Sequence, residues 1–181
     1  GRAVLIDLPR DVVTAKAEFI WPEKVDIRSY KPSVTGNKRQ IMQAAAAIGK
    51  AKKPVAYIGG GVISSNAAEQ IREFAELTRI PVTHTLMGIG GFPGTHPLSL
   101  GMLGMHGTYY ANMAIHNSDL IVAIGARFDD RVTGKVEGFA PEAKIIHIDV
   151  DPTSIRKNVR VDIPVVGDVK HVMVELNKEL R

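Results

Sequence analysis

The chain has 181 residues, a formal net charge of +4 and no cysteine. This length corresponds to one ordinary domain, and the lack of cysteine excludes disulfides, thiolate zinc sites and a cysteine nucleophile. No apolar run approaches the roughly 20 residues of a membrane-spanning helix, and the scattered basic residues form no stripe for nucleic acid. We therefore expect a cytoplasmic protein with neither a membrane nor a nucleic-acid partner.

The first part of the chain has no clean hydrophobic periodicity. It is interrupted by Pro9, Pro22, Pro32 and Gly36. Proline and glycine at such intervals are typical of extended segments. We expect residues 1–36 to be a connector that leads from a preceding domain into a domain over residues 37–181.

From residue 37 onward, helical and strand patterns alternate. Apolar runs predict strands at 54–58, 81–85, 120–124, 144–149 and 164–166. Helical spacing predicts helices at 37–51, from a capping pattern at Asn66–Glu69 onward, at 108–117 and from Val169 to Leu180. Such alternation predicts a three-layer α/β/α, Rossmann-like domain with a parallel sheet of about six strands.

Ligands of such sheets bind beyond the carboxyl ends of the strands. The segments that follow the predicted strands are rich in glycine, carboxylates and arginine, and they are 59–61, 85–88, 125–131, 149–151 and 167–168. Glycine lets the backbone approach a diphosphate, an acid can accept from ribose hydroxyls, and Arg127 or Arg131 can bind phosphate or stack on a flat ring.

Each of these motifs also has a purely structural interpretation. Gly59–Gly61 is not the dinucleotide fingerprint, because Ser64 stands where its third glycine is required. Asp129, Asp130 and Arg131 could form a surface ion-pair cluster. No nucleophile elbow and no Walker loop is present, so the residues predict no catalytic or metal site of their own.

Glycine recurs at every third position from Gly101 to Gly107. This spacing suits neither a helix nor the interior of a strand, and it indicates backbone pressed closely against another group. Met102 and Met105 could pack on a flat ligand or fill core, and His106 could donate to a ligand or be structural. We interpret His84 and His147, which lie inside strands, as structural.

With these loops in place, the sequence resembles the central domain of the catalytic subunits of acetolactate synthase (acetohydroxyacid synthase). The segments that carry the resemblance are Tyr57-Ile-Gly-Gly-Gly, Thr85-Leu-Met-Gly, Leu100-Gly-Met-Leu-Gly-Met-His-Gly-Thr, Gly125-Ala-Arg-Phe-Asp-Asp-Arg, His147-Ile-Asp-Val-Asp and Gly167-Asp-Val. They keep their order and approximate spacing over about residues 3 to 180.

The resemblance implies a parent enzyme that condenses two pyruvates, or pyruvate and 2-oxobutanoate, with loss of carbon dioxide in branched-chain amino-acid synthesis. The fold that the resemblance implies is a three-layer Rossmann-like domain of the DHS-like NAD/FAD-binding type. In this family the central domain carries flavin adenine dinucleotide (FAD), while thiamine diphosphate and Mg²⁺ are bound by the other two domains. The implied partners are the other domains and subunits of a homodimer or homotetramer and a small regulatory subunit. The implied location is the bacterial cytoplasm, or the plastid if the parent comes from a plant.

The resemblance also implies which residues contact FAD. They are Gly59, Gly60, Gly61, Thr85, Leu86, Leu103, Gly104, Met105, His106, Gly125, Ala126, Arg127, Phe128, Asp129, Arg131, Asp149, Val150, Asp168 and Val169. We expect the adenine and ribose near Asp149 and Asp168 and the diphosphate near Gly60 and the Gly125 loop. The flavin ring should face Met105, His106 and Arg131.

Two alternatives remain, namely an NAD-binding Rossmann domain and a vestigial central domain of another thiamine-diphosphate enzyme that binds no dinucleotide. The family's magnesium diphosphate motif, Gly-Asp-Gly followed by Asn, is absent, since Val169 follows Asp168. The catalytic glutamate should also lie in another domain. We therefore expect the chain alone to be catalytically inactive.

Overall fold

A computed structural model of the chain describes residues 5–24 and 32–181. Its contacts divide the chain into two units, residues 1–31 and residues 32–181. In the described part of the first unit, helix α1 (Arg10–Thr14) interrupts the extended connector that the sequence predicts, and its side chains are exposed. The connector expected over residues 1–4 and 25–31 lies outside the described residues.

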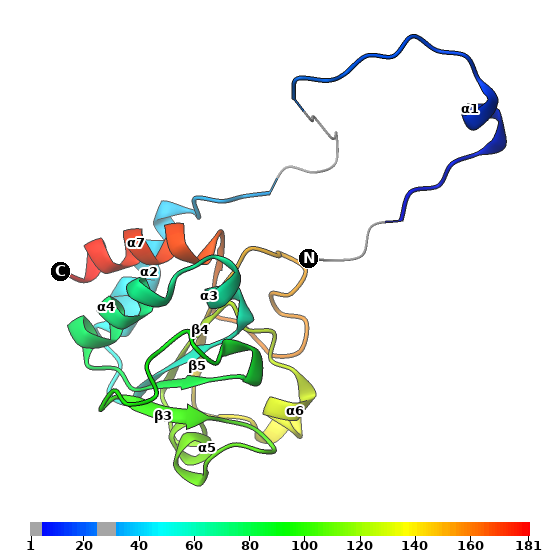
Figure 1. The fold of residues 1–181 in the computed structure, drawn as a ribbon. Coiled ribbons are helices and arrows are strands. Elements are labelled where there is room, and N and C mark those ends of the chain that lie inside the picture. The colour runs from blue at the N-terminus through cyan, green and yellow to red at the C-terminus, as the bar shows by residue number, and fades with distance from the viewer. Residues whose placement is uncertain (1–4, 25–31) are drawn as a thin grey trace. The chain divides into compact units, whose positions relative to one another are not determined.

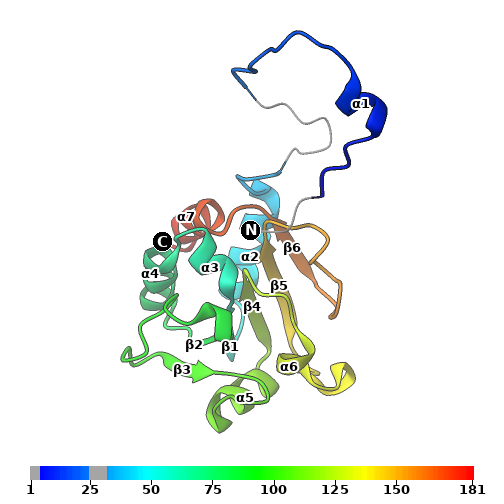
Figure 2. The same cartoon turned by 45° about the vertical axis from the view of Figure 1, so that its right-hand side comes forward.

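The second unit is built on a parallel sheet of six strands. The strands are β1 (Pro54–Ile58), β2 (Val82–His84), β3 (Ser99–Met102), β4 (Leu120–Ile124), β5 (Lys144–Asp149) and β6 (Ile163–Val166). Their order is β3-β2-β1-β4-β5-β6, with each neighbouring pair parallel (Figure 2). This is the strand order of doubly wound dinucleotide-binding sheets, and it confirms the predicted fold class.

Both faces of the sheet are buried, because alternate residues of each central strand enter different hydrophobic clusters. On β4, Leu120, Val122 and Ile124 pack into one cluster, and Ile121 and Ala123 pack into the other. A strand covered on both faces must be apolar at every position, as the run Leu-Ile-Val-Ala-Ile is.

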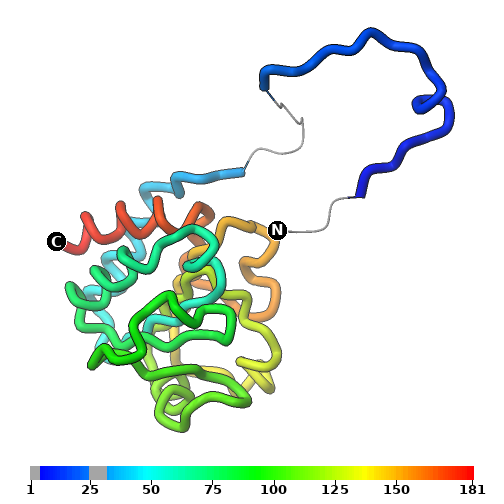
Figure 3. Tube along the Cα trace, viewed as in Figure 1, coloured from blue at the N-terminus to red at the C-terminus, as the bar shows by residue number. Residues whose placement is uncertain are grey.

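Helices cover the two faces unequally. Helices α2 (Lys38–Ile48), α3 (Gly60–Ser64), α4 (Ala68–Thr78) and α7 (Val169–Leu180) contribute to the first cluster. Helix α5 (Tyr109–His116), the short α6 (Asp130–Thr133) and the segments 139–143 and 150–161 on either side of β5 cover the second face. The three-layer arrangement is visible in Figure 1, and in Figure 3 the red tube of α7 runs beside the cyan tube of α2. Single 3-10 turns lie at η1 (Leu86–Gly88) and η2 (Val136–Gly138).

Two elements differ from the sequence prediction. Strand β3 lies at the start of the glycine-rich stretch, where no strand was predicted, and pairs only with β2. Asn66 does not cap a helix, because it adopts a φ of 51° after α3 ends, and α4 begins at Ala68 with no side-chain cap. The difference arises from α3, a one-turn helix that begins directly in the glycine run and ends just before Asn66.

The segment just before α2 belongs to the compact second unit. The N–H of Asp168 donates to the carbonyl of Val34 over 2.8 Å, and Gly36 packs against Gly167 and Val172 at the start of α7. These contacts place Pro32 to Gly36 in the same compact unit as the sheet. Among the described residues, no helix is both long and apolar enough to cross a membrane.

Candidate functional site

All six strands point the same way, so the segments that follow them meet at one edge of the sheet (Figure 2). Every residue that the resemblance implies as an FAD contact lies at this edge. These residues occupy the end of β1 and the start of α3, the β2–η1 turn, the loop after β3, the β4–α6 loop, the end of β5 and the start of α7.

The tips of β1 and β4 touch through backbone alone. A methyl group on Gly59 would lie 2.3 Å from the carbonyl oxygen of Gly125, and one on Gly61 would lie 2.6 Å from the Gly125 Cα. The N–H of Gly61 donates to the Gly125 oxygen over 3.0 Å. Gly125 itself has a φ of +60°, a left-handed conformation that favours glycine. Packing within the protein therefore requires these glycines, whatever binds above them.

Gly60 differs from its two neighbours. It is the first residue of α3, and the nearest atom to an added methyl group would be the Met87 Cβ, at 3.2 Å. The first N–H groups of a helix have no partner within the helix. The next two N–H groups of α3 already have acceptors within the protein, because Gly61 donates to the Gly125 carbonyl and Val62 donates to the Gly59 carbonyl.

The turn after β2 is held by Thr85. Its hydroxyl accepts from the N–H of Gly88 over 3.0 Å, which closes η1. Gly88 is pressed against the β1 backbone, where a methyl group would lie 2.8 Å from the Ile58 oxygen. Leu86, between them, leaves 68% of its surface exposed.

The loop after β3 is fastened to two neighbours. Gly104 has a φ of +95°, and its N–H and carbonyl bind the side-chain amide of Asn112 on α5 over 2.8 and 3.0 Å. The next N–H, that of Met105, donates to the carbonyl of Arg131 over 2.9 Å. The close backbone approach predicted for this glycine-rich stretch is confirmed at Gly104, since a methyl group there would lie 2.6 Å from the Arg131 oxygen.

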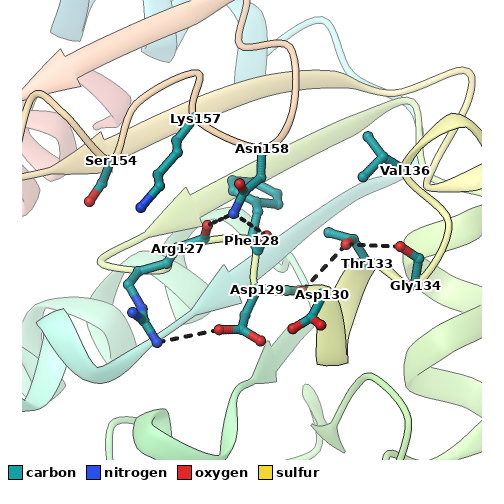
Figure 4. A pocket seen from close by; sticks show the side chains of 10 residues that line it. All are labelled: Arg127, Phe128, Asp129, Asp130, Thr133, Gly134, Val136, Ser154, Lys157 and Asn158. Carbon is teal, nitrogen blue, oxygen red and sulfur yellow. Dashed lines mark hydrogen bonds and ion pairs between the residues drawn. The ribbon is translucent and has the colours of Figure 1, made fainter.

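The β4–α6 loop carries the charged residues of the site. Asp129 caps α6 by accepting from the N–H of Arg131 over 3.2 Å, and its other oxygen lies 3.3 Å from the Arg127 guanidinium (Figure 4). Hydrogen bonding with Asp130, together with the Arg131 N–H, lowers the pKa of Asp129. A surface ion pair is thus present at Asp129, and its partner is Arg127, which lies outside the cluster considered from the sequence.

Beneath this loop lies an aromatic cluster. Phe128 is 1% exposed, and its ring meets those of Tyr57 and His147 edge to face at 5.3 and 5.2 Å. The Nε2 of His147 lies 2.7 Å from the carbonyl of Ala126, and because a carbonyl only accepts, this nitrogen carries the proton. Burial lowers the pKa of His147. The structural interpretation of His147 fits this environment.

Two carboxylates stand at the far strand tips. The buried Asp149 closes β5, and its Oδ1 accepts from the N–H of Asp151 over 2.8 Å. Asp168 caps α7, where its Oδ1 accepts from the N–H of His171 and lies 2.9 Å from the Nδ1 of that side chain. Both therefore have structural duties besides any ligand contact. Within the described ranges, no group of three potential metal ligands occurs.

A cavity of about 490 Å³ opens beside the β4–α6 loop. Arg127, Phe128 and Asp129 line one side, and Ser154, Lys157 and Asn158 of the β5–β6 segment line another (Figure 4). The sequence did not indicate that the last three residues lie near the site. They follow β5 in a segment without hydrophobic periodicity, and only the fold brings them to this edge.

Exposure separates the implied contacts into two classes. Leu86, Met105, His106, Arg127, Arg131 and Val150 are exposed and can present side chains to a ligand. Leu103, Ala126, Phe128 and Val169 are at most 3% exposed, so they could meet a ligand through backbone atoms only.

Comparisons with known proteins agree with this architecture. Residues 41–176 match the family model described as the thiamine pyrophosphate enzyme, central domain. The chain is 55% identical to an acetolactate synthase of Mycobacterium leprae over 99% of its own length and 29% of the relative. It is 50% identical to the large subunit of acetolactate synthase isozyme 3 of Escherichia coli over 96% of its length and 30% of that relative.

An X-ray structure of an enzyme from Mycobacterium smegmatis, described as thiamin diphosphate-dependent, aligns with a TM-score of 0.71 at 28% identity. The alignment covers 87% of this chain and 30% of that one. The chain thus spans about 30% of the length of these relatives. On the family match, the sheet order and the structural alignment together, the chain belongs to the central-domain family of thiamine pyrophosphate enzymes.

Proposed function

We propose that the domain binds FAD across the carboxyl edge of its sheet and that its parent is an acetolactate synthase. The observation that carries the proposal is the convergence of all the implied contact residues on this one edge. Ligands of doubly wound sheets bind at the strand-order switch point, which here lies between β1 and β4. The diphosphate is therefore assigned to the space above Gly60 and Gly125.

The chemistry of the edge suits a dinucleotide with a flat ring. Leu86, Met105 and Val150, which follow β2, β3 and β5, expose 68%, 63% and 48% of their surface, so each offers an apolar side chain to a ligand that extends along the edge. Arg127 supplies an exposed guanidinium for phosphate, and Asp149 supplies a carboxylate at a strand end for ribose hydroxyls.

The parent's activity follows from the relatives named acetolactate synthase. The proposed reaction condenses two pyruvates, or pyruvate and 2-oxobutanoate, with loss of carbon dioxide. Thiamine diphosphate and Mg²⁺ are assigned to other domains, because the chain lacks the magnesium diphosphate motif. Formation of acetolactate by the purified chain would contradict this division of labour.

The test of FAD binding is direct. The chain is mixed with FAD, desalted and examined by visible absorption, where retained flavin absorbs. Asp149→Ala should lower the FAD affinity about tenfold, since a hydrogen bond to a charged group contributes ~1.5–3 kcal/mol. Its matched control is Asp162→Ala, because Asp162 accepts from the N–H of Ile145 near the opposite end of the same strand.

Gly60→Val should weaken retention as well, because a branched side chain would cover the first N–H of α3. Gly94→Val is its control, since a Cβ at Gly94 meets no atom within 4 Å. A colourless wild-type chain that ignores added FAD would support the vestigial alternative. The contact of Gly59 and Gly61 with Gly125, which requires glycine without any ligand, is compatible with that alternative.

A further inference from the structure

Two asparagines outside the implied contact set bind the backbone of the two loops that carry most of it. Asn112 lies on α5 and binds Gly104. Asn158 lies after β5 and binds the β4–α6 loop, as Figure 4 shows. Each bond crosses from one structural element to another. Each also falls at a loop residue with positive φ, namely Gly104 at +95° and Phe128 at 52°.

The bond set of Asn112 is specific to an amide. Its Oδ1 accepts from the Gly104 N–H over 2.8 Å while its Nδ2 donates to the Gly104 carbonyl over 3.0 Å. Leucine could make neither bond. Aspartate could accept the first but would place a negative oxygen against the carbonyl. The side chain is only partly exposed, so water substitutes poorly for the lost partners.

Asn158 acts on the neighbouring loop through donors alone. Its Nδ2 lies 3.0 Å from the Phe128 carbonyl and 3.3 Å from the Arg127 carbonyl. Left-handed φ is costly for a bulky residue and persists only where the surroundings fix it. The buried Phe128 ring fixes one end of this turn, and Asn158 fixes its two carbonyls.

The two loops are themselves joined. The Met105 N–H donates to the Arg131 carbonyl over 2.9 Å, so the loop held by Asn112 meets the loop held by Asn158. Polar bonds thus run from α5 through the tips of β3 and β4 to the β5–β6 segment. A displacement at either asparagine is expected to move the exposed side chains of Met105 and Arg127.

We infer that Asn112 and Asn158 are positioning residues, which hold the loops 103–106 and 125–131 in the conformation that receives the flavin dinucleotide. The inference rests on the proposed FAD binding for its ligand. The loop geometry itself is a property of the ligand-free chain. The two parts can therefore be measured separately.

The experiment compares Asn112→Leu, Asn158→Leu and Asn117→Leu in the full chain. Asn117 is the matched control, because it lies directly after α5 and its side-chain Nδ2 donates to the Met113 carbonyl within that helix. Amide hydrogen exchange of the ligand-free chain reports loop order, and FAD titration followed by flavin fluorescence reports affinity.

For Asn112→Leu we expect exchange in residues 103–107 and the FAD dissociation constant each to rise about tenfold, since two hydrogen bonds are lost. For Asn158→Leu we expect a rise of about threefold in residues 125–131, since its donors are more exposed. Asn117→Leu should stay within about twofold on both measurements. Helix α4 should keep its exchange rates in all variants.

Asn112→Asp adds a readout that packing alone would not move. A protonated carboxyl offers one donor and one acceptor, as the amide does, so FAD affinity of this variant should recover toward wild type, relative to Asn112→Leu, as the pH falls from 7 to about 4, near the ordinary pKa of aspartate. If Asn112→Leu does not fold, this variant carries the test. Unchanged loop exchange in Asn112→Leu, or an equal change in Asn117→Leu, overturns the inference. Loop exchange that rises in a chain without FAD affinity would sustain the positioning role and refute only the proposed ligand.

Discussion

Adjacent glycines at the tip of β1 should respond very differently to a single methyl group. Gly59 has φ −125° and ψ −170°, which alanine adopts freely, so any penalty there is steric. Its added Cβ would lie 2.3 Å from the Gly125 oxygen and 2.7 Å from the Ala126 Cα, and backbone atoms cannot rotate away. At Gly60 the nearest neighbour would be 3.2 Å away, on the Met87 side chain.

Relief of the overlap at Gly59 requires the tips of β1 and β4 to separate, which strains the hydrogen bonds from Gly59 to Ile124 and from Gly61 to Gly125, both 3.0 Å long. Overpacking of ~1–3 kcal/mol and two weakened hydrogen bonds of ~1 kcal/mol each, less ~0.4–1 kcal/mol gained in the unfolded chain, give a net loss of about 3 kcal/mol. This loss corresponds to a fall in Tm of about 6–12 °C.

Gly60→Ala should change the free energy of unfolding by less than about 1 kcal/mol, because ordinary side-chain adjustment accommodates it. Urea unfolding followed by far-ultraviolet circular dichroism measures both variants against wild type. Equal stability of the two variants, or a Gly59→Ala variant within 1 kcal/mol of wild type, would refute the assignment of Gly59 to a backbone contact.

Three further substitutions test groups whose environments are equally explicit. Burial lowers the pKa of His147 below its ordinary value of 6.5, so the folded state binds fewer protons than the unfolded state. The free energy of unfolding should therefore be highest above pH 6.5 and fall as the pH drops below that value. His147→Gln, which keeps a donor for the Ala126 carbonyl, should flatten this pH dependence in urea titrations at pH 7.5 and 5, whereas the control His116→Gln at an exposed position should not. Two backbone N–H groups before β1 donate to Asp119 over 2.7 and 2.9 Å and lower its pKa from 3.8. The ionised carboxylate therefore stabilises the folded state above that pH, and this contribution is lost in acid. Asp119→Ala should lower the free energy of unfolding by about 1 kcal/mol at pH 7, after discounting its exposure, and the difference from wild type should shrink as the pH falls below about 3. The buried Tyr57 hydroxyl has no hydrogen-bond partner among the described residues, so Tyr57→Phe should leave the free energy of unfolding unchanged or raise it by up to ~1 kcal/mol. A loss above about 1 kcal/mol in urea unfolding would reveal a partner.

The sequence was most informative where burial dictates residue type. The run Leu120–Ile124 is apolar at every position because both of its faces are covered, and this pattern alone predicts a central parallel strand. Strand β3 was missed because it lies at the sheet edge, is only half-buried and contains Gly101 with a φ of +74°. Edge position and local backbone geometry leave no apolar signature in a sequence.

The sequence predicts where the candidate site should lie but not how its loops are held. Strand ends in a parallel sheet meet at one edge, so the sequence predicts that the loops after the strands lie together. The sequence does not predict which side chains of those loops point outward, because Phe128 is buried and its neighbour Arg127 is exposed. The roles of Asn112 and Asn158 depend on contacts between segments distant in the chain, and no pattern in the sequence indicates them.

The glycines at the tips of β1 and β4 are weak evidence for a ligand, because contacts within the protein already require most of them. Gly59, Gly61 and Gly125 are required by the contact between β1 and β4, so a central domain without any dinucleotide would keep them too. Residues that packing leaves unconstrained discriminate better, above all Gly60 and the exposed Arg127. If the domain binds FAD, stability should be sensitive at Gly59 and flavin affinity at Gly60, so that two adjacent glycines separate fold from function. A domain that only supports the parent enzyme would retain the first sensitivity and lack the second.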